Sequence, residues 1–251
     1  IASHPTLHYK QIKKALKNGK HVICESPVAL SGEECDELYE IAGKSGLILM
    51  DAIKTAYSTA YARMLLLIES GAIGKVVSVD ATCTSLRVNE NGDPDYYKTN
   101  WNSSCDWGPN AILPVFQLLG TKYKDIRIIS SFADEDKDYD LFSKFDFTYD
   151  SAVATVKVGK GVKSEGELVV SGTKGYVYVP APWWKTDYFE IRYENPADKK
   201  RYFYQLNGEG IRYEIVAFIK AIESGRVIDM IPREVSRAIC EVVSSKNRVE
   251  I

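Results

Sequence analysis

Apolar residues recur at helical spacing near the start of the chain. Leu7, Ile12 and Leu16 fall on one side of a helical pattern, and the residues between them are mostly polar. This spacing predicts an amphipathic helix over residues 6–18, with Thr6 as its N-cap.

Short apolar runs and helical patterns then alternate as far as Ala52. One run covers residues 21–24 and another covers 47–50. Between them, Ser31 followed three residues later by Glu34 has the pattern of a capping box, and Gly46 is a suitable end for the helix. Strands that alternate with helices in this way are typical of a doubly wound parallel sheet.

The pattern changes beyond Ala52. The following residues are rich in Tyr, Val, Thr and Ile and contain frequent turns, which predicts a large, mostly antiparallel sheet that is partly open on one face. We expect strands at 75–84, 127–132, 152–158, 167–171 and 176–179, and helices at 59–70, 211–223 and 233–245. The predicted fold class is therefore α/β, followed by an α+β region.

Composition excludes several classes of protein. The chain has 251 residues, with 32 Lys and Arg against 34 Asp and Glu, a net charge of -2 that gives no reason to expect a nucleic-acid partner. No apolar run approaches the roughly 20 residues of a membrane helix. The five cysteines are scattered and contain no C-x-x-C pair, which favours unpaired thiols in the cytoplasm.

The three histidines all lie within the first 21 residues. This distribution argues against a Ser-His-Asp or Cys-His hydrolase and against a metal site, so we expect no metal. Any acid–base group later in the chain must be Asp, Glu, Lys, Tyr or Cys.

Two N-terminal motifs resemble the Gfo/Idh/MocA oxidoreductases. The stretch 19–27, GKHVICESP, is similar to the family's G-K-H-V-x-x-E-K-P, and 3–8, SHPTLH, is similar to T-P-N-x-x-H. The resemblance implies NAD or NADP as cofactor, a proline at 27 that is commonly cis, and a set of cofactor-binding residues: Ser3, His4, Pro5, His8, Glu25 and Pro27. On the residues alone, His8 could instead face solvent.

A third motif carries the candidate catalytic residues. The stretch 104–110, SCDWGPN, resembles the family's G-x-x-x-D-W-G-P-H, whose Asp and His face the substrate. Asp106 is retained, Asn110 replaces the histidine, and Ser26 replaces the lysine of the first motif. At i and i+4, Asp106 and Asn110 share one helix face. We take Asp106, Asn110 and Ser26 as the catalytic candidates.

Other interpretations of these residues stay open. Asp106 could be an N-cap, and Ser26 could be a simple turn residue. Lys54, Lys98 or Tyr97 could supply the proton instead of Asp106. Two adjacent tryptophans, Trp183 and Trp184, could stack on a sugar ring, although packing in the core or an interface is the commoner role.

No G-x-G-x-x-G is present in the 251 residues. We therefore expect residues 1–53 to be the C-terminal part of a dinucleotide-binding Rossmann domain whose Gly-rich half is missing, and 54–251 to be an α+β substrate and oligomerisation domain. The resemblance implies an NAD(P)-dependent oxidoreductase acting by hydride transfer on the CH-OH group of a sugar, polyol or related alcohol. It also implies a homodimer or homotetramer formed through the large sheet. The alternative is a catalytically degenerate member that binds a sugar-like ligand or a protein partner.

Overall fold

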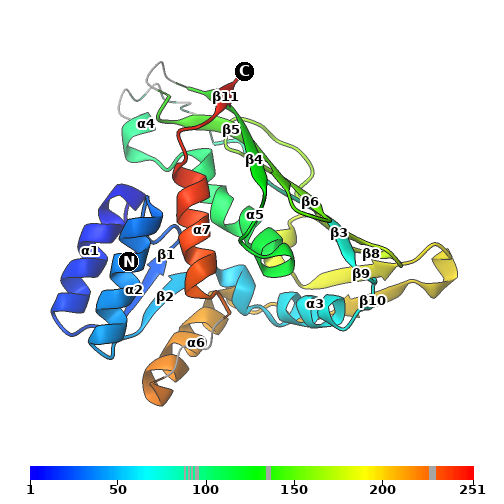
Figure 1. Ribbon diagram of the computed structural model, residues 1–251, viewed down its shortest axis with the longest axis horizontal. Helices are drawn as coiled ribbons and strands as arrows, with labels where there is room; N and C mark the ends of the chain where they lie inside the picture. The colour runs from blue at the N-terminus through cyan, green and yellow to red at the C-terminus, as the bar shows by residue number, and fades with distance from the viewer. Residues whose placement is uncertain (88, 90, 92, 94–95, 134–136, 226–229) are drawn as a thin grey trace.

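A small αβ unit and a large sheet lie on opposite sides of two helices (Figure 1). The computed structural model describes residues 1–251 except 88, 90, 92, 94–95, 134–136 and 226–229. Helices α5 (Ser103–Leu119) and α7 (Arg233–Ser244) run between the two parts, α7 against the small unit and α5 against the large sheet. The predicted domain boundary at 53/54 stays a prediction.

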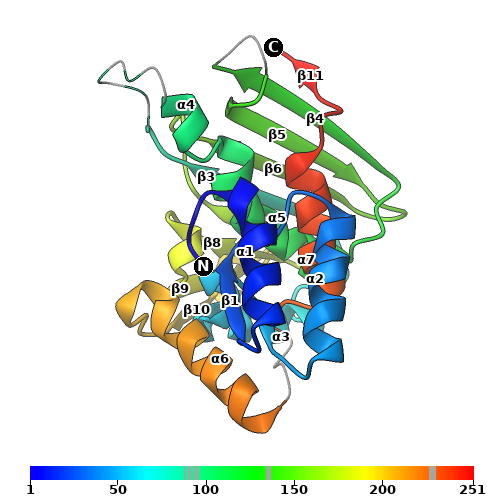
Figure 2. The same cartoon turned by 90° about the vertical axis from the view of Figure 1, so that its left-hand side faces the viewer.

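The small unit contains the parallel pair predicted from the first fifty residues. Strands β1 (Val22–Glu25) and β2 (Leu49–Ala52) pair in parallel, with Val22 opposite Leu49. Helices α1 (Pro5–Lys17) and α2 (Gly32–Lys44) accompany them, and Figure 2 looks onto these two helices. Their buried side chains form one apolar core that includes Ile12, Leu16, Cys24, Leu38 and Leu49.

Helix capping in this unit confirms one prediction and corrects another. The Ser31 hydroxyl accepts a hydrogen bond from the amide of Glu34 (3.1 Å), as the capping-box pattern predicted. The prediction of Thr6 as the N-cap of α1 is wrong, because α1 begins at Pro5 and its N-cap is His4. Proline suits the first helical position, since its fixed φ matches the helix and its missing N–H would have no partner there.

The large sheet is mostly antiparallel, as predicted. Within the described residues nine strands form it, in the order β10-β9-β8-β7-β3-β6-β5-β4-β11. Among the described pairs of this sheet, only β3–β6 and β4–β11 are parallel. The strands are β3 (Val76–Thr84), β4 (Asp125–Phe132), β5 (Asp140–Thr148), β6 (Val153–Gly159), β7 (Leu168–Gly172), β8 (Tyr176–Val179), β9 (Tyr188–Arg192), β10 (Lys200–Phe203) and β11 (Val249–Glu250).

Helices cover one face of this sheet. Helix α5 packs on β3, β5 and β6, and α3 (Thr59–Glu69) contacts β9. Burial alternates along β5 and β6, which is the pattern of a sheet with one covered face and one open face. The use of the open face in an oligomer stays a prediction.

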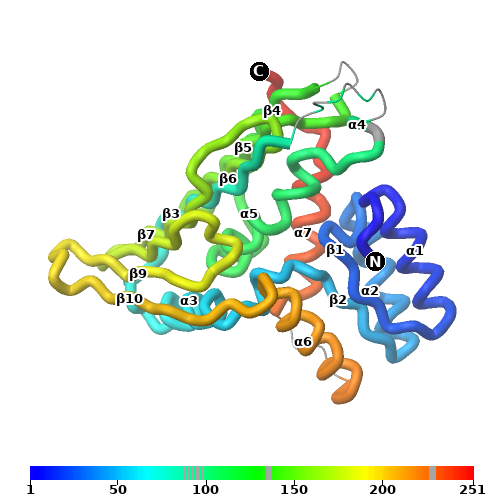
Figure 3. Tube along the Cα trace, turned by 180° about the vertical axis from the view of Figure 1, so that it is seen from behind, coloured from blue at the N-terminus to red at the C-terminus, as the bar shows by residue number. Residues whose placement is uncertain are grey.

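The remaining helical segments connect these layers. Helix α6 (Ile211–Ser224) extends away from both sheets and contacts the short helix that follows β2 (Figure 3). The short segments are α4 (Tyr96–Thr99), η1 (Lys54–Tyr57), η2 (Trp183–Lys185), η3 (Pro196–Asp198) and η4 (Gly208–Gly210).

Helix α5 is positioned by its cap and by a glycine. The Asn102 side chain accepts a hydrogen bond from the amide of Cys105 (2.9 Å), so Asn102 is the N-cap and the interpretation of Asp106 as N-cap is wrong. At Gly108, a Cβ would lie 2.8 Å from Cγ1 of Val243. This glycine therefore lets α7 approach α5 closely at the turn that carries Asp106.

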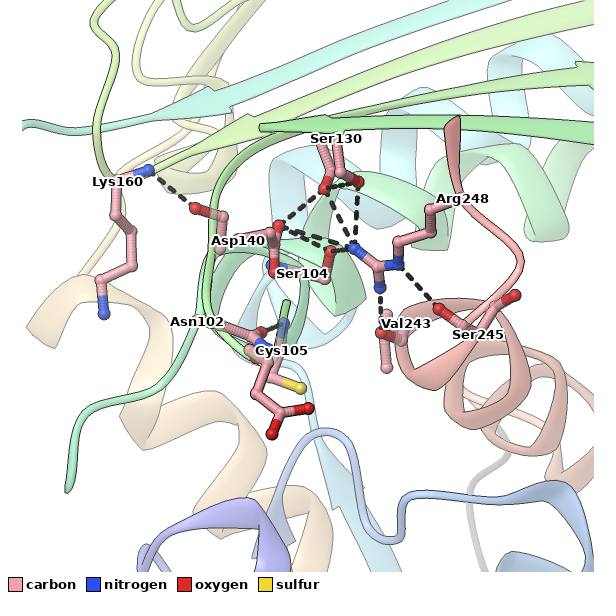
Figure 4. A network of polar contacts seen from close by, with 12 residues as sticks. Asn102, Ser104, Cys105, Ser130, Asp140, Lys160, Val243, Ser245 and Arg248 are labelled. Carbon is pink, nitrogen blue, oxygen red and sulfur yellow. Dashed lines mark hydrogen bonds and ion pairs between the residues drawn. The ribbon is translucent and has the colours of Figure 1, made fainter. Parts of the chain in front are cut away.

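A buried ionic network also holds the start of α5 (Figure 4). The Arg248 guanidinium donates to the hydroxyls of Ser104 (2.9 Å) and Ser143 (3.1 Å) and lies 3.8 Å from the Asp140 carboxylate. Asp140 in turn accepts from the amide (3.1 Å) and hydroxyl (2.9 Å) of Ser104. Sheet, C-terminal segment and the first turn of α5 are thus joined at one point.

Loss of the Asp140 carboxylate should destabilise the protein strongly. We expect Asp140→Ala to lower the free energy of unfolding by about 3–5 kcal/mol, because Arg248 would stay buried without its counter-charge. The matched control is Asp138→Ala, since the Asp138–Lys246 pair (2.7 Å) has side chains that are 73% and 77% exposed. The control should cost less than about 1 kcal/mol. Equal urea-denaturation midpoints for the two variants would contradict this account.

Candidate active site

The carboxyl ends of β1 and β2 bring the first candidate residues together. In the parallel register Cys24 lies opposite Asp51 and Glu25 opposite Ala52. Residues that follow the two strands therefore meet at one edge of the sheet, which is where open parallel sheets bind ligands. The Ser26–Pro27 peptide bond is cis, as the resemblance implied.

His8 holds two loops at this edge. It is buried, with Nδ1 2.8 Å from the carbonyl oxygen of Pro27 and Nε2 2.8 Å from that of Ser3. Burial lowers the pKa of His8 although both carbonyls oppose the shift. The solvent-facing alternative is therefore wrong. The structure places His8 where it fixes the loops that contain Ser3 and Pro27, and its contact with a cofactor stays a prediction.

Ser26 and Asp51 form a buried polar pair without completed hydrogen bonds. The Ser26 hydroxyl and both carboxylate oxygens of Asp51 are buried and have no hydrogen-bond partner in the described part of the chain. Burial raises the pKa of Asp51 to about 6, and the hydroxyls of Ser236 and Ser26 lie close enough to offset part of that shift. The catalytic role of Ser26 stays a prediction, and its hydroxyl faces this buried carboxylate.

Glu214 is a further acidic residue, which the sequence analysis did not single out. It lies in the first turn of α6, is buried, and its Oε2 has no hydrogen-bond partner within the described residues. Burial, followed by the charge of Glu25, raises its pKa to about 7, and Lys54 opposes the shift. One signal was available: Glu214 and the buried Ala221 are seven residues apart and so share a helix face.

Asp106 and Asn110 reach the same edge from α5. The Asp106 carboxylate lies 3.0 Å from Nζ of Lys160 and 3.9 Å from the guanidinium of Arg87. Its charge helps to raise the pKa of Glu25, for which burial is the main cause. The Thr55 hydroxyl, which follows β2, donates toward Oδ1 of Asn110 (3.1 Å) and lies 2.9 Å from the Trp184 carbonyl oxygen.

The two tryptophans have different roles. Trp183 is fully buried and donates its indole N–H to the carbonyl of Thr82 (3.1 Å), which confirms the packing interpretation for this residue. Trp184 is half-buried, with its ring centroid 4.9 Å from that of Trp107. The Trp107–Trp184 pair is therefore an aromatic surface next to Asn110.

Five other predicted residues remain to be placed. His4, Pro5 and Tyr97 line a cavity of about 740 Å³ between the start of α1 and the C-terminal segment, and Glu25, Ser26 and Asp106 do not line it. Lys54 is half-buried beside Glu209, at 3.9 Å. The side chain of Lys98 lies outside the described part of the chain.

Chemically, this edge combines carboxyl groups with hydrogen-bonding groups. Asp106 can exchange a proton, and the Asn110 amide, oriented by the buried Thr55 hydroxyl, can bind a hydroxyl group. Among the described residues, no group of three or more His, Cys, Asp or Glu side chains is arranged to hold a metal ion.

All five cysteines are buried and unpaired, as predicted. None of the helices in the described ranges is long and apolar enough to cross a bilayer.

Sequence comparison identifies the N-terminal region. Residues 1–52 match the model of the GFO_IDH_MocA family, described as an oxidoreductase family with an NAD-binding Rossmann fold. Levoglucosan dehydrogenase of Pseudarthrobacter phenanthrenivorans is 35% identical over 82 residues, which are 33% of this chain and 21% of that protein. The scyllo-inositol 2-dehydrogenase (NADP(+)) IolU of Bacillus subtilis is 40% identical over 57 residues, 23% and 17% of the two chains. These matches span 17% to 34% of the curated relatives.

Structural comparison extends the likeness to the whole chain. KijD10, a 3-ketoreductase from Actinomadura kijaniata solved with NADP and TDP-benzene, has a TM-score of 0.85 at 18% identity, covering 100% of this chain and 78% of that one. Levoglucosan dehydrogenase with NADH and levoglucosan has a TM-score of 0.82 at 20% identity, covering 97% and 74%. Residues 1–52 thus belong to the Gfo/Idh/MocA oxidoreductases, and the chain has the fold of these enzymes.

The raised pKa of Glu214 predicts a pH-dependent stability. The folded protein keeps a proton up to pH values near 7, whereas an unfolded glutamate releases it near 4.3. The stabilisation from this group is therefore complete below about pH 4 and is lost as the pH rises through about 7. Between about pH 5 and about pH 8 the wild type loses this contribution, whereas Glu214→Gln has no such proton to release. The difference in free energy of unfolding, variant minus wild type, should therefore increase by on the order of 2 kcal/mol over this pH range.

Urea denaturation at the two pH values measures this gain. Glu223→Gln, on the exposed end of the same helix, is the matched control and should follow the wild type at both pH values. An identical pH dependence for Glu214→Gln and wild type would show that Glu214 does not hold its proton in the folded state.

Proposed function

We propose, from the membership of residues 1–52 in the Gfo/Idh/MocA oxidoreductases, that this protein is an NAD(P)-dependent oxidoreductase acting on a CH-OH group of a sugar or cyclic polyol. The observation that carries the proposal is the position of Asp106. Its carboxylate, retained from the family motif, lies beside the carboxyl ends of β1 and β2 and influences Glu25 there. We also propose a cytoplasmic location, in keeping with the unpaired thiols.

The residues at this edge fit the nicotinamide end of a dinucleotide. His8 fixes the loops that contain Ser3 and Pro27 side by side. The Ser26 hydroxyl is buried there and forms no hydrogen bond within the described residues. Ser3, His8, Glu25 and Pro27 would hold or support that end of the cofactor. His4 and Pro5, the other two predicted residues, would contribute from the cavity at the start of α1.

When bound, nicotinamide supplies the acceptor or donor of the hydride. The chain itself handles the proton and the orientation of the substrate. Asp106 accepts the hydroxyl proton when the alcohol is oxidised and returns it when a ketone is reduced. The Asn110 amide binds a neighbouring hydroxyl group, and the buried Thr55 hydroxyl orients that amide through its contact with Oδ1.

The substrate class follows from the aromatic surface and from the relatives. A sugar or cyclitol ring offers an apolar C–H face, which packs against the Trp107–Trp184 pair, and a polar rim, which meets Asn110 and Asp106. Levoglucosan dehydrogenase and scyllo-inositol 2-dehydrogenase, by their names, act on compact cyclic polyols of this kind. Asn110 adds a hydrogen-bonding group but cannot exchange a proton near neutral pH. Asp106 therefore carries the proton transfer without a histidine partner.

Activity on a polyol panel tests this proposal. The protein, expressed from its natural start, should reduce NAD or NADP with at least one of a set of inositols and anhydrosugars, followed by NAD(P)H absorbance. Asp106→Asn should lower kcat/KM by roughly 10²–10⁴-fold, because the proton acceptor is lost. The control Asp125→Asn, in the exposed first position of β4, should leave kcat/KM unchanged.

Two outcomes would contradict the proposal. One is wild-type turnover that Asp106→Asn does not lower. The other is a wild type that binds NAD(P)H yet turns over no substrate, with activity appearing only in the Ser26→Lys, Asn110→His double variant, as expected of a degenerate binding protein.

A further inference from the structure

A buried lysine stands behind Asp106. Lys160 directly follows β6, and its backbone is fixed because its amide lies 2.9 Å from the carbonyl oxygen of Leu141 and 3.0 Å from the Ser103 hydroxyl. Its ammonium lies 3.0 Å from the Asp106 carboxylate and donates to the carbonyl of Trp101 (2.5 Å). No sequence motif drew attention to this lysine, since it comes from the large sheet.

Burial makes the ion pair with Asp106 the dominant interaction of this ammonium. A buried cation is costly unless it has a counter-charge and hydrogen bonds. Within the described residues, Asp106 is the one carboxylate at ion-pair distance from Lys160. Arg87 also approaches Asp106, at 3.9 Å, but its side chain is 61% exposed, so solvent screens its charge.

Asp106 and Lys160 differ in how far their side chains are exposed to solvent. The Asp106 side chain is 26% exposed and that of Lys160 is 4% exposed. A ligand at the edge of the small sheet can therefore touch the carboxylate, whereas the ammonium stays covered behind it. Lys160 can act on a substrate only through Asp106.

We propose that Lys160 is a positioning residue that holds the Asp106 carboxylate in the place where it acts as the base for alcohol oxidation. This inference rests on the proposed function. In the oxidation, the hydroxyl O–H bond breaks and its proton goes to the Asp106 carboxylate, while the C–H bond breaks and its hydride goes to nicotinamide C4. A C=O bond forms, so the substrate is oxidised and the nicotinamide is reduced.

Other charged and titratable groups also lie near Asp106, and some attract its carboxylate while others repel it. Arg87, from the segment after β3, favours the carboxylate. Glu25, at the end of β1, opposes it, because two carboxylates repel each other. Cys105 and Tyr139 also lie within the influence of the Asp106 charge. Lys160 is the one covered cation among these groups, so its removal should have the largest effect.

The separate effects on kcat and KM test the role of Lys160. In Lys160→Met, kcat should fall by about tenfold or more while KM for the polyol changes little, because a misplaced base slows the proton transfer more than it weakens binding. Lys160→Arg, which restores the cation, should recover most of kcat. If Lys160→Met does not unfold cooperatively, Lys160→Gln replaces it, since it keeps a donor for the Trp101 carbonyl. Lys144→Met, which removes a lysine paired with Asp146 (2.9 Å) on β5, is the control and should keep the wild-type kcat and KM.

A second readout does not depend on turnover. At one neutral pH, the carboxyl ¹³C resonance of Asp106 in Asp-labelled protein, assigned through Asp106→Asn, should move or broaden in Lys160→Met and stay unchanged in Lys144→Met. A wild type without turnover would refute the proposed function, and this resonance would still decide whether Lys160 holds the Asp106 carboxylate in place. An unchanged Asp106 resonance in folded Lys160→Met or Lys160→Gln, or an unchanged kcat in an active enzyme, would overturn the inference.

Discussion

The candidate site depends on where helix α5 begins. The first turn of this helix is held by the Asn102 cap, by the buried Asp140–Arg248 network and by the bond between Ser103 and the Lys160 backbone. Gly108 then allows α7 to approach α5 one turn later. Because Asp106 lies between these anchors, its carboxylate has a fixed place relative to the small sheet. Without that placement, the two parts of the chain would not form a common site.

Electrostatics then separates the acidic residues into two kinds. Asp51 and Glu214 are buried and form no ion pair within the described residues, so burial raises their pKa values to about 6 and about 7. Asp106 instead lies in an ion pair with Lys160. Environments that treat neighbouring carboxyl groups so differently are typical of acid–base sites. Here the carboxyl group with a cation is also the one that a ligand can reach.

The small unit could be predicted well from sequence because its information is local. Apolar spacing and the Ser31 cap located its helices and strands, and the GKHVICESP motif located the edge where Glu25 and Pro27 lie. Helix starts were less certain, because Ser, Thr, Asn and Asp all compete as caps. Asn102 rather than Asp106 caps α5. Helix α1 begins at Pro5, so its N-cap is His4 and not the predicted Thr6.

Lys160 and Glu214 could not be assigned from sequence, because their roles arise from tertiary contacts. Lys160 lies 54 positions after Asp106 in the chain and meets it only because β6 ends beside α5. Glu214 becomes perturbed only when α6 packs on η1 near Glu25. The aromatic pair likewise joins Trp107 of α5 to Trp184 of η2. Each of these contacts joins residues that are far apart in the chain.

Isotope transfer tests the central claim most directly. A cyclic polyol that carries deuterium at its reacting carbon is incubated with the protein, expressed from its natural start, and with oxidised NAD or NADP. Mass spectrometry of the nicotinamide product then shows where the deuterium went. The account predicts deuterium on the reduced nicotinamide ring for wild type and much slower transfer for Asp106→Asn. Cofactor binding without any deuterium transfer, across all polyols and sugars tested, would contradict it.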